Sequence, residues 1–276
     1  MNHKSNVIAA IVGLTMTSFL ATVSRAATYD FETLILGSIT NQDNWKIVTR
    51  DPHITTPAGT SNTSTKVFVG SGSGGVEDIA TRINNANFSF APFAGTERDA
   101  ILQLDLRLGP DSIVQSTTAF GHDNDANGTI AVSEISRQFG GVYSPGIGIT
   151  VPSFIIYRPS GFVLGAYPTG MIATDWVRAK LVMDLTANGG DGSGSVFALD
   201  LTRGDTIFTP VSGLQNINLQ LTTGPAPTTW DGLFAETVGG TTGGQLDNIT
   251  ALIPEPATIA LLELGAMLLF LRRRRG

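Results

Sequence analysis

Hydrophobic and polar residues alternate with a period of two along the middle of the chain, the pattern of β-strands that bury one face. In residues 101–108, leucine occupies every second position and polar residues lie between. Residues 176–185 and 216–221 repeat this alternation. It predicts strands whose apolar sides face a common core. Further strands are expected at residues 45–49, 65–69, 86–91, 114–120, 153–158, 161–166, 195–202 and 245–252.

Turn-forming residues separate these predicted strands. Residues 188–192 read Asn-Gly-Gly-Asp-Gly, and residues 239–244 read Gly-Gly-Thr-Thr-Gly-Gly. Apart from the two chain ends, only residues 76–83 have apolar spacing that suits a helix. Many strands joined by short connections predict an all-β fold, a jelly-roll β-sandwich, in residues 27–252.

The first 26 residues have the composition of a secretory signal peptide. Lys4 lies in a short polar start, and mostly apolar residues follow over positions 7–23. The small residues Ser24 and Ala26 suit cleavage after Ala26. An uncleaved membrane anchor is the alternative interpretation of the same pattern.

The C-terminus combines three features in a fixed order. Pro254, Glu255 and Pro256 are followed by mostly apolar residues 257–271, enough for a membrane helix of roughly 22 Å. Such a helix is shorter than a hydrocarbon core of about 30 Å, so basic residues must reach toward the headgroups. These basic residues would lie on the cytoplasmic side of the membrane. The basic residues are Arg272, Arg273, Arg274 and Arg275.

This order, placed behind a signal peptide, resembles the PEP-CTERM sorting signal of exported bacterial proteins. The resemblance implies that residues 253–276 are recognised by an exosortase, a transpeptidase-like membrane enzyme, which cleaves near the Pro-Glu-Pro. It further implies transient membrane anchoring, in a Gram-negative bacterium that makes exopolysaccharide. Glu263 departs from the pattern because a carboxylate inside an apolar segment opposes insertion. An ordinary tail anchor shares the same positive-inside geometry.

Composition and charge narrow the classes of function. The 276 residues include no cysteine, which excludes disulfides and thiolate metal sites. The formal net charge is −6, but Lys4, Arg25 and the four terminal arginines account for six of the 17 basic residues. Glu255 and Glu263 account for two of the 23 acidic ones, so residues 27–252 have a net charge of −10. A domain this acidic is unsuited to nucleic acid.

Residues 123–134 match the twelve-residue calcium-loop pattern at every defined position. Side-chain oxygens at alternate positions, one main-chain carbonyl and a bidentate glutamate supply the oxygens that calcium takes. The pattern therefore predicts a calcium ion held in a loop between strands. A hydrated turn without metal is the alternative. The predicted ligands are Asp123, Asp125, Asn127, Thr129 and Glu134.

No catalytic set of residues is recognisable. The histidines of residues 27–252, His53 and His122, lie in no metal-ligand spacing, and there is no nucleophile-elbow motif. Asp105 and Asp184 are outward acids on predicted strands and are expected to be solvated. A glycoside hydrolase would have to assemble two carboxyl groups about 5–9 Å apart from distant strands.

The pattern of strands also resembles the concanavalin A-like lectin and glucanase sandwich. The residues that carry this resemblance are Phe31-Glu32, the segment from Gly37 through Gln42 to Trp45, Trp176 at the start of a long strand, and Asp247-Asn248-Ile249. The paired carboxylates that glucanases of this fold bring on one strand are absent from the sequence. Large aromatic side chains either stack on sugars or pack in the core, and the core is the commoner place. These residues are Trp45, Trp176, Trp230, Tyr143, Tyr157 and Tyr167, with Trp230 expected to be the most exposed.

Together these features predict an exported protein of the cell envelope, outer surface or extracellular matrix. It is expected to be non-catalytic, and either structural or associated with glycan, with an exosortase and an exopolysaccharide as partners. The alternative is a polysaccharide-active hydrolase or lyase of the same fold. Sequence alone identifies no glycan-binding residues.

Overall fold

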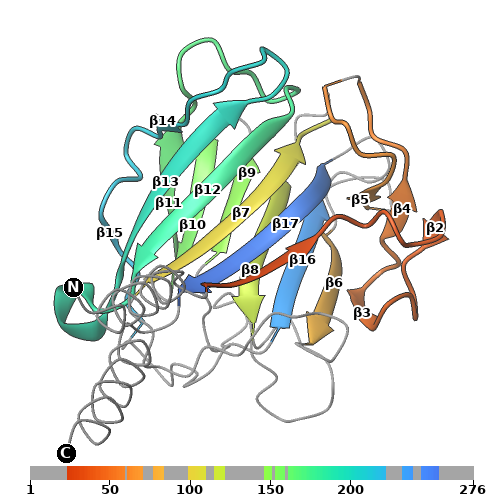
Figure 1. Cartoon of the computed structure of the whole chain (residues 1–276), viewed down its shortest axis with the longest axis horizontal. Coiled ribbons are helices and arrows are strands. Elements are labelled where there is room, and N and C mark those ends of the chain that lie inside the picture. Colours follow the sequence, from red (N-terminus) through yellow and green to blue (C-terminus); the bar gives the residue numbers. More distant parts are fainter. Residues whose placement is uncertain are drawn as a thin grey trace, which may run out of the picture.

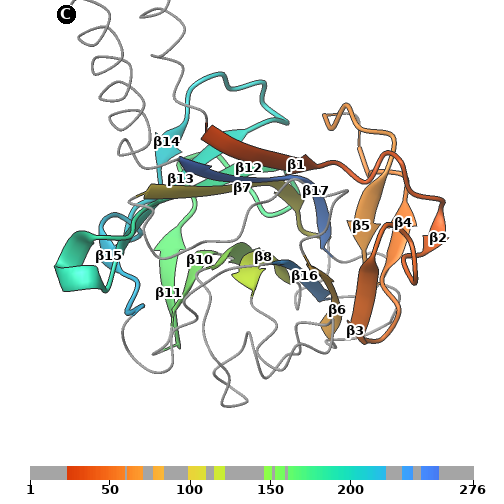
Figure 2. The ribbon, with the colours of Figure 1, turned by 60° about the horizontal axis from the view of Figure 1, so that its bottom comes forward.

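The computed structural model describes residues 24–59, 61–70, 77–83, 99–109, 115–121, 146–150, 153–158, 161–221, 232–238 and 244–254. These residues form two antiparallel sheets packed face to face, so the predicted all-β sandwich is confirmed (Figures 1 and 2). The calcium-loop residues, residues 1–23 and residues 255–276 lie outside the described ranges. Among the described residues, no helix has the length and hydrophobicity that a membrane span requires.

The larger sheet, called sheet A here, has ten strands in the order β14-β13-β12-β7-β17-β5-β4-β2, with β1 paired to β17 and β15 paired to β13. It faces the viewer in Figure 1. Its strands are β1 (Ser24–Tyr29), β2 (Gly37–Ser38), β4 (His53–Thr55), β5 (Val67–Val69), β7 (Asp99–Arg107), β12 (Val177–Asp184), β13 (Ser193–Asp200), β14 (Thr209–Pro210), β15 (Ile217–Asn218) and β17 (Gln245–Pro254).

The second sheet, sheet B, has seven strands in the order β11-β10-β9-β8-β16-β6-β3 and forms the other layer in Figure 2. A short 3-10 helix, η2 (Ala187–Gly190), lies in the connection between β12 and β13. The strands of sheet B are β3 (Trp45–Thr49), β6 (Glu77–Ile83), β8 (Gln115–Gly121), β9 (Gly146–Thr150), β10 (Ser153–Arg158), β11 (Gly161–Ala166) and β16 (Gly232–Val238).

The alternation predicted for β7 and β12 sets the two faces of sheet A. Leu102, Leu104 and Leu106 of β7 are fully buried between the sheets. The residues between them point to the outer face of sheet A, because successive side chains of a strand point to opposite sides. Ala179 and Leu181 of β12 are likewise buried in the core, and Lys180 between them lies on the outer face.

One end of the core is aromatic. The rings of Tyr29, Phe31, Trp45 and Phe68 stack in edge and tilted arrangements with centroids 4.9–6.2 Å apart. Phe31 has a φ of 59°, a conformation unfavourable for a bulky residue, and the complete burial of its ring offsets that cost. The core placement expected for Trp45 and Trp176 is confirmed, since the two side chains are 0% and 1% exposed.

Two ends of the described chain lie side by side. Strand β1 pairs with the second half of β17, and Ser24 lies opposite Pro254. Strand β1 therefore begins three residues before the predicted domain limit at residue 27, and β17 ends two residues after the predicted limit at residue 252. The limits themselves, and the signals beyond them, stay predictions.

Two expectations from periodicity are wrong. Apolar spacing predicts a helix over residues 76–83, but Glu77–Ile83 is strand β6, which pairs with β16 on one side and β3 on the other. Pairing on both sides outweighs a weak helical spacing. Alternation predicts a strand over residues 216–221, but only Ile217–Asn218 pairs with β13, because Asn216 and Gln220 adopt left-handed φ values of 55° and 57°.

Candidate functional site: a polar network and a surface hollow

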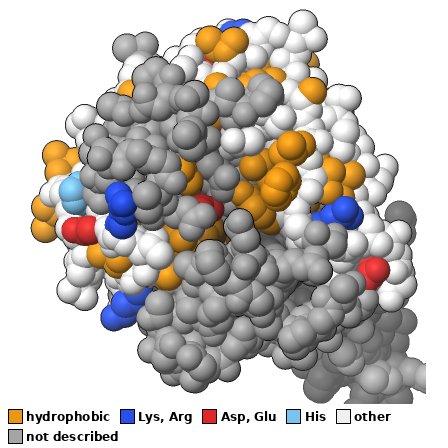
Figure 3. All heavy atoms as spheres, turned by 180° about the vertical axis from the view of Figure 1, so that it is seen from behind, with side chains coloured by type: hydrophobic (Ala, Val, Ile, Leu, Met, Phe, Trp, Pro, Cys, Tyr) orange, Lys and Arg blue, Asp and Glu red, His pale blue; other side chains and the backbone are white. Residues whose placement is uncertain are grey.

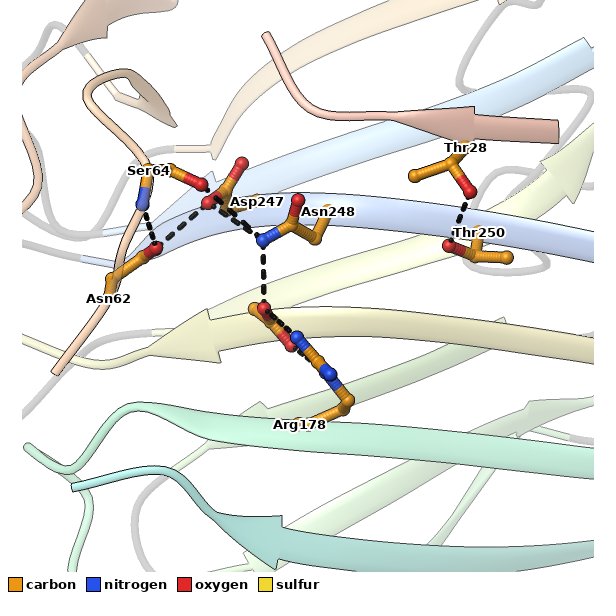
Figure 4. A network of polar contacts seen from close by, with 8 residues as sticks. Thr28, Asn62, Ser64, Arg178, Asp247, Asn248 and Thr250 are labelled. Atoms are coloured by element: carbon orange, nitrogen blue, oxygen red, sulfur yellow. Dashed lines mark hydrogen bonds and ion pairs between the residues drawn. The ribbon is translucent and has the colours of Figure 1, made fainter. Parts of the chain in front are cut away.

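A row of charged side chains crosses three neighbouring strands on the outer face of sheet A. Arg178 of β12 lies opposite Asp105 of β7, and Asp105 lies opposite Asp247 of β17. Cross-strand partners project from the same face of a sheet, so the three side chains are adjacent. Figure 4 shows Arg178 and Asp247 together with the neighbouring Asn248.

Asp105 and Arg178 form a two-pronged ion pair. Arg178 Nε donates to Asp105 Oδ1 at 2.6 Å, and Arg178 Nη2 donates to Asp105 Oδ2 at 2.8 Å. The hydrogen bonds to Asp105 raise the pKa of the Arg178 guanidinium. The Asp105 side chain is only 2% exposed, so the expectation that it is a solvated acid is wrong. Asp184, the other acid in that expectation, is half-buried and accepts hydrogen bonds from the main chain of the following turn.

Asp247 is a fully buried carboxylate with one partnered oxygen. Its Oδ2 accepts hydrogen bonds from Asn62 Nδ2 at 2.9 Å and from Asn248 Nδ2 at 3.1 Å. Its Oδ1 has no hydrogen-bond partner. Burial raises the pKa of Asp247 from 3.8 to about 6, against the opposing effect of the polar groups of Ser64 and Asn62 nearby. Below pH 6 this side chain is therefore mostly neutral in the folded protein.

A β-bulge makes the network possible. The pairing of β17 with β7 shifts between Asp247 and Thr250, and Asn248 in the shift has a φ of 47°. Asparagine tolerates this left-handed conformation better than most residues. Its Nδ2 donates to Asp105 Oδ2 at 2.9 Å as well as to Asp247, so the bulge links the two carboxylates.

The network therefore brings together two carboxylates, Asp105 and Asp247, whose strands are far apart in the sequence but adjacent in the sheet. However, Asp247 is 0% exposed and Asp105 is neutralised by Arg178. A substrate oxygen cannot reach either group, so this pair of carboxylates does not form an active site. Among the described residues, no group of three or more acidic or histidine side chains is arranged to hold a metal ion.

A surface hollow of about 360 Å³ lies between the end of β11 and the connection from β13 to β14. Ligand sites in proteins begin at about 300 Å³, so the hollow has room for one small ligand unit. Its lining includes hydroxyl, charged and apolar side chains. The lining residues are Ala166, Tyr167, Pro168, Thr169, Met171, Arg203, Asp205, Thr209, Pro210 and Ser212.

Arg203 is held in place at the rim of this hollow. Its Nη1 donates to the carbonyl of Thr169 at 3.0 Å, and its Nη2 lies 3.3 Å from Asp205 Oδ2. Its Nε lies 3.5 Å from Oδ2 of the buried Asp200, whose pKa is raised by burial. Two carboxylates thus compensate one guanidinium, and the hollow has no excess positive charge.

Tyr167 forms the aromatic part of the hollow. Its ring packs edge-on against Phe154 at 5.3 Å, and its hydroxyl donates to the carbonyl of Thr150 at 2.6 Å. Burial raises the pKa of this hydroxyl, which stays neutral at physiological pH. Of the other aromatic candidates, Tyr157 is half-buried on β10, and Trp230 and Tyr143 lie outside the described residues.

An apolar strip leads along β11 to the hollow. Phe162 and Leu164 are 61% and 49% exposed, and alternation places them on the same side as Ala166, which lines the hollow. Val163 between them packs against the core, so the strip belongs to the outer face of sheet B. Figure 3 shows hydrophobic side chains gathered on the side of the molecule opposite to that in Figure 1.

Sequence reasoning missed Arg203 and Asp205. A signal was present, since a charged Arg-Gly-Asp turn follows predicted strand 195–202 directly. Nothing local indicated that Tyr167, more than 30 positions earlier, would lie beside that turn.

Comparisons with known proteins identify no family. No protein-family model matches the chain, and no curated protein sequence matches it significantly. Solved structures similar to this chain include three that share 7–11% sequence identity with it. The T. cruzi calreticulin globular domain is 9% identical over 83% of this chain and 90% of that chain, with a TM-score of 0.44. A carbohydrate esterase from Shiga toxin-encoding bacteriophage phi24B is 11% identical over 83% and 97%, with a TM-score of 0.39.

The carbohydrate recognition domain of Emp46p, in its potassium-bound form, is 7% identical over 82% of this chain and 95% of that chain, with a TM-score of 0.40. At these values the similarities carry no conclusion about what this chain binds.

Proposed function

We propose that this chain is an exported, non-catalytic protein of the cell surface or matrix, whose β-sandwich binds a neutral glycan at the hollow beside Tyr167 and Arg203. The observation that carries the proposal is the mixed lining of the hollow. Sugars present hydroxyl groups and apolar C–H faces together, and the hollow offers hydroxyl, guanidinium and carboxylate groups beside tyrosine, proline and methionine side chains.

Charge selects a neutral glycan over an acidic one. Asp200 and Asp205 compensate Arg203 at the rim, and residues 27–252 have a net charge of −10. A polyanion such as a uronate polymer would be repelled by this domain. The exposed strip of Phe162 and Leu164 gives a longer chain an apolar surface next to the hollow.

The hydroxyl groups of Thr209 and Ser212 provide a direct test. We expect the double variant Thr209→Val with Ser212→Ala to bind a neutral glycan such as dextran about tenfold more weakly, since each lost hydrogen bond is worth about 0.5–1.5 kcal/mol. Binding is measured by affinity electrophoresis or calorimetry. Thr206→Val, in the same connection but outside the hollow, is the matched control. The proposal would be contradicted if the double variant bound dextran as tightly as the Thr206→Val control, or if the wild-type protein bound alginate more tightly than dextran.

The C-terminal motif of Pro254, Glu255, Pro256 and Arg272–Arg275 supports processing by an exosortase-type membrane enzyme. We expect mass spectrometry of the surface protein to find a chain that ends near the Pro-Glu-Pro and lacks the arginines. Replacing Glu255 with alanine should leave an unprocessed, membrane-bound chain. An intact arginine tail on the mature surface protein would refute this part of the proposal.

Calcium binding by residues 123–134 is a separate part of the proposal. We expect calorimetry to detect one calcium ion per chain and the melting temperature to rise with calcium, because ligands that bind only the folded state stabilise it. The double variant Asp123→Ala with Glu134→Ala should lose the binding heat and the rise. Asp111→Ala, an acid outside the motif, is the control.

A further inference from the structure

The chain contains a single Asp–Pro bond, Asp51–Pro52, and the structure surrounds it with polar groups. The hydroxyl of Ser38 on β2 donates to Asp51 Oδ1 at 2.5 Å, and that of Thr40 donates to the same oxygen at 3.3 Å. His53 Nε2 lies 3.7 Å from Asp51 Oδ2. Residues from two segments therefore hold one carboxyl group that is adjacent to a prolyl bond.

The backbone at this bond is constrained on both sides. Strand β3 ends at Thr49 in sheet B, and β4 begins at His53 in sheet A, so only three residues connect the two sheets. The first of them, Arg50, has a φ of 54°, a left-handed conformation that non-glycine residues rarely adopt. Pro52 is buried, and its carbonyl accepts a hydrogen bond from Ile39 N at 3.0 Å. Strained backbone of this kind concentrates at functional positions.

The chemistry of an Asp–Pro bond suits self-cleavage. The amide to proline is tertiary, and its nitrogen is a better leaving group once it takes up a proton. The side-chain carboxyl of aspartate can reach the carbonyl carbon of its own residue in a five-membered ring. A carboxylate that attacks in this way is a covalent nucleophile. The Asp51 side chain is 45% exposed, so water can reach the product of the attack.

We propose that the folded chain cleaves its own Asp51–Pro52 bond in mildly acidic conditions. An Asp51 carboxyl oxygen forms a bond to the main-chain carbonyl carbon of Asp51, and the bond from that carbon to the Pro52 nitrogen breaks. The Pro52 nitrogen takes a proton and leaves as a secondary amine, and the N-terminal piece ends in a cyclic anhydride. One water molecule opens the anhydride, so that one peptide bond and one water become one carboxyl group and one amine.

Asp51 is the catalytic residue in this reaction, and Ser38 and His53 are positioning residues. Ser38 and Thr40 bring neutral hydroxyl groups to Asp51, and among the described residues His53 is the titratable side chain that lies within 4 Å of the Asp51 carboxyl group. Arg50, the preceding residue, is exposed. The His53 imidazole lies beside the carboxyl group, so the pH profile of cleavage reports on the role of this side chain.

The cut chain would stay assembled. The piece before the cut contains β1, β2 and β3, which pair with β17, β4 and β6 on the other side of the cut. Phe31 and Trp45 in this piece are fully buried in the core. Cleavage would release the strain at Arg50 and leave a two-chain sandwich.

The test follows cleavage of the purified full chain at about pH 5 and about pH 8 by mass spectrometry and N-terminal sequencing. We expect a fragment that begins at Pro52 to accumulate at the lower pH, about tenfold or more faster in the folded chain than in the chain unfolded in urea. Size-exclusion chromatography should show both fragments eluting together. No fragment beginning at Pro52, or equal rates in folded and unfolded chains, would overturn the proposal.

Variants separate the roles. Asp51→Asn should abolish cleavage, and Pro52→Ala should slow it strongly while leaving Asp51 and its partners in place. His53→Gln should shift the pH profile, and Ser38→Ala should lower the rate without such a shift. Circular dichroism confirms that each variant is folded. Cleavage of Asp51→Asn at the wild-type rate, or an unchanged profile in His53→Gln, would overturn the roles assigned here.

Discussion

Replacing Arg178 with methionine is expected to lower the free energy of unfolding by about 3 kcal/mol at neutral pH. The change leaves Asp105 charged, 2% exposed and without its two-pronged partner. Breaking one side of a buried ion pair costs about 3–5 kcal/mol, and the lower end applies because the Arg178 side chain is still 34% exposed. Urea unfolding followed by circular dichroism measures the loss.

Two further variants test whether the loss of stability comes from leaving the Asp105 carboxylate without its partner. Lys180→Met changes the next outward residue of the same strand, whose ammonium lies over the ring of Phe208 at 4.1 Å, and should cost less than about 1 kcal/mol. The double variant Asp105→Asn with Arg178→Met should recover most of the stability, since the amide oxygen that replaces the carboxylate can still accept the hydrogen bond from Asn248. If Arg178→Met costs no more than Lys180→Met, the ion pair does not stabilise the sheet.

The strands and their two faces were largely predictable, because alternation is a local property of the sequence. Residues 45–49, 153–158 and 161–166 were expected as strands and are β3, β10 and β11 with those same limits. Strand β9, Gly-Ile-Gly-Ile-Thr, was missed because glycine is a turn signal as well as a strand residue. Here Gly146 and Gly148 allow close approach to β8, where an added Cβ would meet main-chain oxygens.

The environment of Asp105 was not predictable from its own strand. Its partner Arg178 is 73 positions away and Asn248 is 143 positions away. Only the order of strands, β12-β7-β17, makes them neighbours. The same reason explains the hollow, which joins residues that follow β11 to residues that follow β13. The sequence of each of these two polar connections carries no sign that the other lies next to it in the folded protein.

The Asp247 carboxyl group is expected to make the domain less stable as pH rises from about 4 to about 6. Burial raises its pKa from 3.8 in the unfolded chain to about 6 in the folded one, so the folded state binds the proton more tightly in this interval. The stability that comes from proton binding is complete below pH 4 and is lost as pH rises through about 6. A shift of about two pKa values corresponds to about 3 kcal/mol.

Asp247→Asn tests this expectation, because the amide resembles the neutral acid in shape and its oxygen can still accept from Asn62 and Asn248. At about pH 7.5 the variant should be more stable than the wild type by up to about 3 kcal/mol, and at about pH 4 the two should nearly coincide. Urea unfolding over this pH range measures the difference in free energy of unfolding between the variant and the wild type. The other titrating groups are the same in both proteins, so their effects cancel in this difference. Asp99→Asn, an exposed acid on the same face of sheet A, should leave the pH dependence unchanged. A constant difference at every pH would show that folding leaves the pKa of Asp247 unchanged, and would contradict the expectation.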